Sequence, residues 1–164
     1  IVLNEIITNQ NKKVIMTSNE KNTSALIHLS TLSQYIIPFG GFIFPIIIWS
    51  SKKNDSEFID ANGKQALNFQ LSMFLYTLLL LLISIPVLLY SIFKNVSYED
   101  LENGNFVFDQ LSTGNITGIV IIAAVAFMLL CFSKITEFIL VIIAGVKASN
   151  GESYKYPLTI NFFK

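Results

Sequence analysis

The sequence predicts an all-α integral membrane protein, folded as a helical bundle. Hydrophobic residues make up 52% of the 164 residues, and charged residues make up only 13%, against about 25% in a typical soluble domain. The apolar residues also run together in long stretches. A water-soluble protein of this size could not cover its surface with so few charges, and a disordered chain would be poor in apolar residues.

Charge and residue types exclude several classes of function. The net charge is zero and the chain has no Arg, whereas a nucleic-acid binder needs a basic surface. His28 is the only histidine and Cys131 the only cysteine, too few for a zinc site of the His/Cys kind or for an internal disulfide. The sequence has no phosphate loop, HExxH motif, nucleophile elbow or dinucleotide fingerprint. We therefore expect a non-enzymatic protein that binds no cofactor, no metal and no nucleic acid.

Residues 1–23 are predicted to be an N-terminal tail, and residues 24–164 a single transmembrane domain. The first methionine is Met16. Residues 1–15 have no apolar core and no small-residue cleavage site, so we do not expect a signal peptide there. Two interpretations stay open: the natural chain starts at Met16 and residues 1–15 are upstream sequence, or they are a genuine tail.

The first two apolar stretches, residues 25–37 and 41–49, are each too short to cross a bilayer. As helices they would measure about 20 Å and about 14 Å, against a hydrocarbon core of about 30 Å. They form either one broken span or a re-entrant hairpin that turns at residues 38–41. Lys21 is expected on the cytoplasmic side, which favours the hairpin. Trp49 marks the membrane interface at the end of the second stretch in either case.

The third stretch, residues 68–93, and the fourth, residues 116–148, are the predicted transmembrane helices. They would measure roughly 39 Å and roughly 50 Å, enough to cross with some tilt. Pro86 is expected to kink the third stretch. Residues 55–67 are predicted to form a cytoplasmic elbow, an interfacial helix that leads into the third stretch. Residues 94–115 form the outer loop between the two spans.

The charges of the loops predict the orientation. The loop of residues 50–64 and the C-terminal segment from Lys147 are rich in lysine, whereas the loop of residues 94–115 is acidic. Lysine-rich loops stay on the cytoplasmic side of a membrane. We therefore place loop 50–64 and the C-terminus in the cytoplasm, the acidic loop outside, and the protein in the bacterial cytoplasmic (inner) membrane.

Lys134 and Glu137 form the candidate functional site, because both lie inside the fourth stretch. Charges at such depth are costly and usually face protein or water. Three residues apart, the two side chains share a helix face and can pair, and Ser133 and Thr136 widen that polar face. Three interpretations stay open: a neutralised pair packed against the protein's own helices, a docking face for a partner, or part of a polar path.

Further polar residues stand at the start of the third stretch. Asn68 and Ser72 are four residues apart and share a helix face, and Gln70 lies between them. Hydrogen bonding between helices, worth about 1 kcal/mol for each bond, is the favoured interpretation. The same interpretation is favoured for His28 in the first stretch.

Four segments of the chain resemble a known family: residues 25–30, 45–53, 61–70 and 148–158. In this order they are similar to small bacterial membrane proteins of a domain-of-unknown-function family. That family is grouped with the small membrane subunit of the chloroplast inner-envelope protein translocon. The residues that carry the resemblance are His28, Asn68, Phe69, Gln70, Gly151, Tyr154, Tyr156 and Pro157. The resemblance implies a four-segment helical bundle with both termini on one side.

The resemblance and the lack of a catalytic motif together predict an accessory subunit of a larger membrane complex. Protein translocation or membrane-protein biogenesis is the expected process. The expected partners are the lipid bilayer and other membrane-protein subunits. The alternative is a small transporter or channel with a polar path around Lys134 and Glu137.

Overall fold

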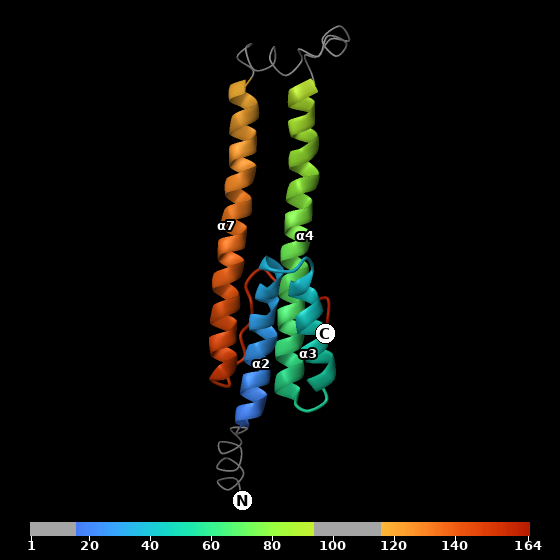
Figure 1. Cartoon of the computed structure of the whole chain (residues 1–164), viewed down its shortest axis with the longest axis vertical. Helices are drawn as coiled ribbons and strands as arrows, with labels where there is room; N and C mark the ends of the chain where they lie inside the picture. Colours follow the sequence, from blue (N-terminus) through green and yellow to red (C-terminus); the bar gives the residue numbers. More distant parts are fainter. Residues whose placement is uncertain (1–15, 94–115) are drawn as a thin grey trace, which may run out of the picture. The chain divides into compact units, whose positions relative to one another are not determined.

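The computed structural model describes residues 16–93 and 116–164, and within them the chain forms helices and turns without a strand. In chain order the elements are α2 (Ser18–Ser30), η1 (Thr31–Tyr35), α3 (Gly40–Lys52), α4 (Glu57–Phe93) and α7 (Ile116–Ser149) (Figure 1). The predicted all-α fold is confirmed. The predicted outer loop 94–115 and the first fifteen residues of the predicted N-terminal tail lie outside the described residues.

The chain divides into two compact units, which share the helices α4 and α7. The described residues of the first unit are 16–68, 141–157 and 161–164. Those of the second unit are 69–93, 116–140 and 158–160. The first unit therefore holds α2, η1, α3, the first turns of α4 and the last turns of α7.

In the first unit, α2 and α3 form a helical hairpin and lie side by side (Figure 1). A capping box starts α2: the Thr17 hydroxyl accepts from the Glu20 backbone N–H at 3.2 Å, and the Glu20 carboxylate accepts from the Thr17 N–H at 2.6 Å. At the turn Phe39 has a φ of 61°, and a Cβ on Gly40 would come within 2.8 Å of the Ser33 carbonyl oxygen. The hairpin, rather than one broken span, is the observed arrangement.

Trp49 joins α3 to the first turns of α4. Its indole Nε1 donates to Asp60 Oδ1 at 2.9 Å, and the Asp60 carboxylate also pairs with Lys64 at 2.7 Å. Gly63 permits this close approach, because a Cβ at that position would overlap the indole ring. From Glu57 onward α4 continues without a break, so the predicted elbow, residues 55–67, supplies the first turns of the long helix.

α7 ends at Ser149, and Gly151 then turns the chain into a non-helical C-terminal tail, residues 152–164. Gly151 has a φ of 80°, and the Glu152 N–H donates to the Lys147 carbonyl at 2.9 Å, as in a Schellman motif. A Cβ on Gly151 would come within 2.9 Å of Lys21 Cε in α2. Both the positive φ and the close contact favour glycine at this position.

Besides residues 158–160, the second unit consists of the parts of α4 and α7 that carry mainly exposed apolar side chains. Leu82 is 60% exposed, Phe127 67% and Phe132 71%. By length and composition, the stretches Glu57–Ser91 and Val120–Ser149 are each long and apolar enough to cross a membrane. These helices support the prediction of two transmembrane spans, and Pro86 lies inside α4 without ending it.

Candidate functional site

A buried hydrogen-bonded cluster in the first unit joins α2, α4 and the C-terminal tail. The side chain of His28 is fully buried. Its Nε2 lies 2.9 Å from Asn62 Oδ1, and its Nδ1 lies 3.0 Å from the Tyr156 hydroxyl oxygen. Asn62 in turn donates from Nδ2 to the Phe58 carbonyl at 2.8 Å. Each ring nitrogen of His28 is therefore bonded to a different segment of the chain.

These partners determine the protonation state of His28. An amide oxygen can only accept, so Nε2 carries the proton and donates to Asn62, while Nδ1 accepts from the Tyr156 hydroxyl. Burial disfavours the charged imidazolium and lowers the pKa of His28 from 6.5 to about 4, and the hydrogen bond to Asn62 acts in the opposite direction. A neutral, enclosed imidazole with both nitrogens bonded is suited to holding segments together.

The side-chain amide of Asn68 hydrogen-bonds to backbone groups at the end of the C-terminal tail. Its Oδ1 accepts from the backbone N–H of Phe162 at 3.0 Å and of Phe163 at 2.8 Å. Its Nδ2 donates to the Phe163 carbonyl at 3.0 Å. The Phe163 ring also meets the Trp49 ring edge-on, with centroids 5.7 Å apart. One amide side chain thus satisfies three backbone groups of a non-helical segment.

Two further side chains of α4, in the second unit, bind the same tail. Ser72 Oγ accepts from the Ile160 N–H at 2.8 Å, and the Tyr76 hydroxyl donates to the Leu158 carbonyl at 2.8 Å. Asn68, Ser72 and Tyr76 are spaced four residues apart and follow one face of α4, and we call this row the tail ladder. These bonds go to backbone groups of the tail, where the sequence suggested a neighbouring helix.

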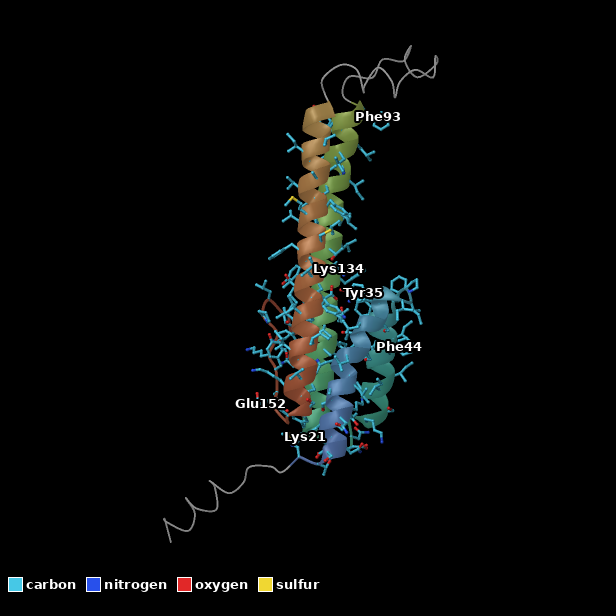
Figure 2. The ribbon with its side chains drawn as sticks, turned by 60° about the vertical axis from the view of Figure 1, so that its left-hand side comes forward. Lys21, Tyr35, Phe44, Phe93, Lys134 and Glu152 are labelled. Atoms are coloured by element: carbon cyan, nitrogen blue, oxygen red, sulfur yellow. The ribbon has the colours of Figure 1, made fainter. Side chains whose placement is uncertain are left out.

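Lys134 and Glu137 are brought together on α7, in the second unit. Figure 2 labels Lys134 on this helix. Lys134 Nζ lies 2.8 Å from Glu137 Oε2; the Glu137 side chain is 0% exposed and that of Lys134 is 41% exposed. The Thr136 hydroxyl donates to the Phe132 carbonyl of its own helix at 2.8 Å, and Ser133 is half-buried. The ion pair forms as the spacing predicts, while Thr136 uses its hydroxyl within α7.

The other residues that carried the family resemblance have places in the packing. Phe69 and Gln70 of α4 are both buried. Tyr154 meets Tyr156 edge-on, with ring centroids 5.1 Å apart, and Pro157 opens the turn that follows. These positions specify how the tail and α4 pack.

The sequence analysis missed Asn62 and Tyr76. Asn62 lies between Asp60 and Lys64, in the segment that was predicted to be an interfacial helix, and it was given no role of its own. Tyr76 was taken for one more residue of the apolar third stretch. Its spacing of four residues from Ser72 was the available signal.

The fold and these buried contacts define a small helical membrane protein whose polar side chains mainly hold its own segments together. Residues 19–163 match the model of the Magnetosome magnetite crystal formation protein family (MamF_MmsF). Because the match covers most of the chain, the protein belongs to this family. No curated protein and no solved structure matches the chain.

The family match corrects the assignment made from the resembling segments. The chain belongs to a magnetosome family and not to one related to a protein translocon. The expected role in protein translocation or membrane-protein biogenesis is therefore wrong, and the transporter alternative is withdrawn with it. The physical reason is that the segments used for the resemblance supply the His28 cluster, Asn68 of the tail ladder and the end of α7, and these contacts specify packing.

Proposed function

We propose that the protein is a non-enzymatic membrane scaffold that contributes to crystal formation, the role named in the description of its family. The observation that supports this proposal most is the use of the buried polar side chains. His28, Asn62 and Tyr156 hydrogen-bond to one another across three segments. A catalytic acid or base has to reach a substrate, whereas these groups are enclosed and hold the fold.

The proposed partners are lipids and other membrane-protein subunits. In the most apolar stretch of each long helix, only 11% of the residues are buried within the chain. The exposed part includes large side chains such as Phe127, at 67%, and Met128, at 69%. In a bilayer such surfaces pack against acyl chains or against the helices of other proteins. The zero net charge gives no support to a nucleic-acid partner.

The proposed orientation keeps loop 50–64 and the C-terminus in the cytoplasm, and the acidic loop 94–115 on the other side of the bacterial inner membrane. The lysine content of loop 50–64 supports it. At the end of α3, Lys53 Nζ lies 5.2 Å from the Trp49 ring centroid. Aromatic and basic side chains gather at membrane surfaces, so this end of the hairpin is suited to the interface.

Complementation in a crystal-forming bacterium tests the proposed role. A strain that lacks its own member of the family receives the wild-type gene, and electron microscopy measures crystal size and number. We expect the wild-type chain to restore both, and the His28→Leu variant to fail because its buried cluster is broken. Leu26→Ala, at an exposed position of the same helix, is the matched control and should behave as wild type.

Membrane fractionation with immunoblotting establishes that the wild-type chain is present in the membrane of the test strain. Crystals that stay abnormal in such cells would show that the chain has no part in crystal formation.

A further inference from the structure

The C-terminal tail follows α4 away from its start and then comes back. Tyr156 bonds to His28, which also bonds to Asn62 in the first turns of α4. The Leu158 carbonyl then bonds to Tyr76, and further along the tail Phe163 bonds to Asn68. Tyr76 lies roughly 12 Å further along the helix axis than Asn68. The tail therefore turns round near Leu158 and returns toward the start of α4.

The start of α4 has the features of a membrane surface. Asp60 bonds both Trp49 and Lys64, and Lys53 lies over the Trp49 ring. Beyond Lys64 the sequence of α4 has no charged residue. Tyr76 lies about 18 Å beyond Lys64 along the helix axis. Measured from that last charge, the turn of the tail lies more than halfway into a hydrocarbon core of about 30 Å.

The tail ladder supplies the hydrogen bonds that a non-helical backbone needs inside a membrane. Hydrocarbon offers no hydrogen bonds, so irregular backbone at that depth is tolerated only where protein satisfies it. Asn68, Ser72 and Tyr76 together satisfy five backbone groups of the tail, at distances of 2.8 to 3.0 Å. The chain thus supplies from one helix face the bonds that water would otherwise supply.

Large apolar side chains of the tail are exposed at and after its turn, while the exposed polar residues nearest to the turn are Lys155 before it and Asn161 after it. Leu158 is 83% exposed, Phe162 49% and Ile160 40%. Leu158 also has a φ of 57°, a left-handed conformation that favours glycine or asparagine and is uncommon for leucine. In water a glycine would adopt this backbone conformation at a lower cost than a leucine. In lipid the exposed leucine side chain would contact acyl chains, which favours leucine at this position.

We propose that the C-terminal tail is a re-entrant element, which inserts its turn at Pro157 and Leu158 among the acyl chains of phospholipids and is held there by the tail ladder. The inference rests on the proposed embedding of α4 in the membrane. It revises the expectation that the whole C-terminal segment lies in the cytoplasm, because only the ends of the tail then lie at the membrane surface.

Spin labels test the depth of the tail in the full-length protein. Cys131 is first replaced by alanine, and the protein is reconstituted into vesicles of phosphatidylcholine and phosphatidylglycerol. Nitroxides are attached to Leu158→Cys, to Leu82→Cys in the lipid-facing part of α4, and to Asn54→Cys in the exposed loop after α3. Power saturation then measures accessibility to oxygen, which enters lipid, and to a nickel chelate, which stays in water.

We expect the Leu158 label to resemble the Leu82 label, with high accessibility to oxygen and severalfold lower accessibility to nickel than the Asn54 label. A Leu158 label as accessible to nickel as the Asn54 label, beside a protected Leu82 label, overturns the re-entrant tail alone. A nickel-accessible Leu82 label overturns the embedding of α4 itself, and the inference about the tail with it.

A second set of variants tests what holds the tail. Asn68→Ala, Ser72→Ala and Tyr76→Phe, combined in one chain with the Leu158→Cys label, remove the side-chain groups of the tail ladder. We expect the nickel accessibility of the label to rise severalfold, because unsatisfied backbone is costly in hydrocarbon. A label that stays at the same depth overturns the role of the ladder.

Discussion

Two buried side chains, His28 in the first compact unit and Glu137 in the second, find their partners in different ways. In the first unit, His28 bonds to partners 34 and 128 residues away in sequence. In the second unit, the buried Glu137 pairs with Lys134, three residues away on the same helix. The first unit is therefore held by contacts between distant segments, whereas the ion pair on α7 is a local product of helical spacing.

The surfaces of the two long helices extend this comparison. The part of α4 in the first unit has its buried Asn62 and Asn68, while further along Leu82 and Ile83 are 60% and 67% exposed. One continuous helix thus changes from a polar packing surface to an apolar, lipid-compatible surface. The difference teaches that substitutions at buried positions of the first unit should cost stability, while exposed positions should tolerate change.

Replacing His28 by leucine should have the largest effect. The variant leaves the Asn62 carbonyl and the Tyr156 hydroxyl buried without their partner, at about 1–3 kcal/mol for each group. We expect the free energy of unfolding, measured by chemical denaturation in detergent micelles, to fall by about 3 kcal/mol. The control Leu26→Ala, at a residue that is 56% exposed, should stay within about 0.5 kcal/mol. If both variants lost the same free energy of unfolding, the claim that the buried His28 cluster stabilises the first unit would be wrong.

Acid should weaken the fold through the same residue, with the next largest effect. The folded pKa of His28 is lowered from 6.5 to about 4, so between these values the unfolded chain binds a proton that the folded chain does not. This contribution to stability is complete above pH 6.5 and is lost as the pH falls toward 4, by about 2 kcal/mol at pH 5. Denaturation at several pH values should show a shallower pH dependence for His28→Leu. Parallel curves for wild type and variant would refute the assignment.

Alanine at Gly63 should destabilise the chain, while alanine at Gly118 should not. A Cβ at Gly63 would overlap the Trp49 indole, but a Cβ at Gly118 would meet nothing within 4 Å. We expect Gly63→Ala to lower the free energy of unfolding by about 1–2 kcal/mol, and Gly118→Ala to leave it unchanged or raise it by up to about 1 kcal/mol. Thermal unfolding followed by circular dichroism compares them, and equal midpoints would argue against the close packing of Trp49.

Tyr156→Phe should have the smallest effect, because it removes one hydroxyl and keeps the ring. We expect a loss of about 1 kcal/mol in the free energy of unfolding. In the His28→Leu background the same change should cost much less, since its partner is already gone. A double-mutant cycle measures this coupling, and strictly additive losses would mean that the bond between His28 and Tyr156 contributes nothing.

The sequence predicted the second unit better than the first for a physical reason. The length of an apolar run and the spacing of two residues are local properties, so the two spans could be predicted from run length and the Lys134–Glu137 pair from spacing. The hairpin was one of two alternatives, and the left-handed Phe39 at its turn has no sequence signal of its own.

The contacts of the C-terminal tail could not be predicted in this way. Asn68 meets Phe163 across 95 residues of sequence, and no local pattern encodes such a pairing. The family resemblance failed for a related reason, because segments such as residues 61–70 and 148–158 contain residues required for packing. Packing residues can be recognised in a sequence without indicating what the protein does.

The central claim is that His28 is a neutral structural link, and its ring can be observed directly. The chain has one histidine, so protein labelled with ¹⁵N only in its histidine rings, and purified through a tag without histidine, gives the NMR signals of this ring alone. Between pH 7 and pH 5 the account predicts a neutral ring with its proton on Nε2 and unchanged shifts, because its pKa is about 4. A ring that titrates near pH 6.5, or carries its proton on Nδ1, would contradict the account.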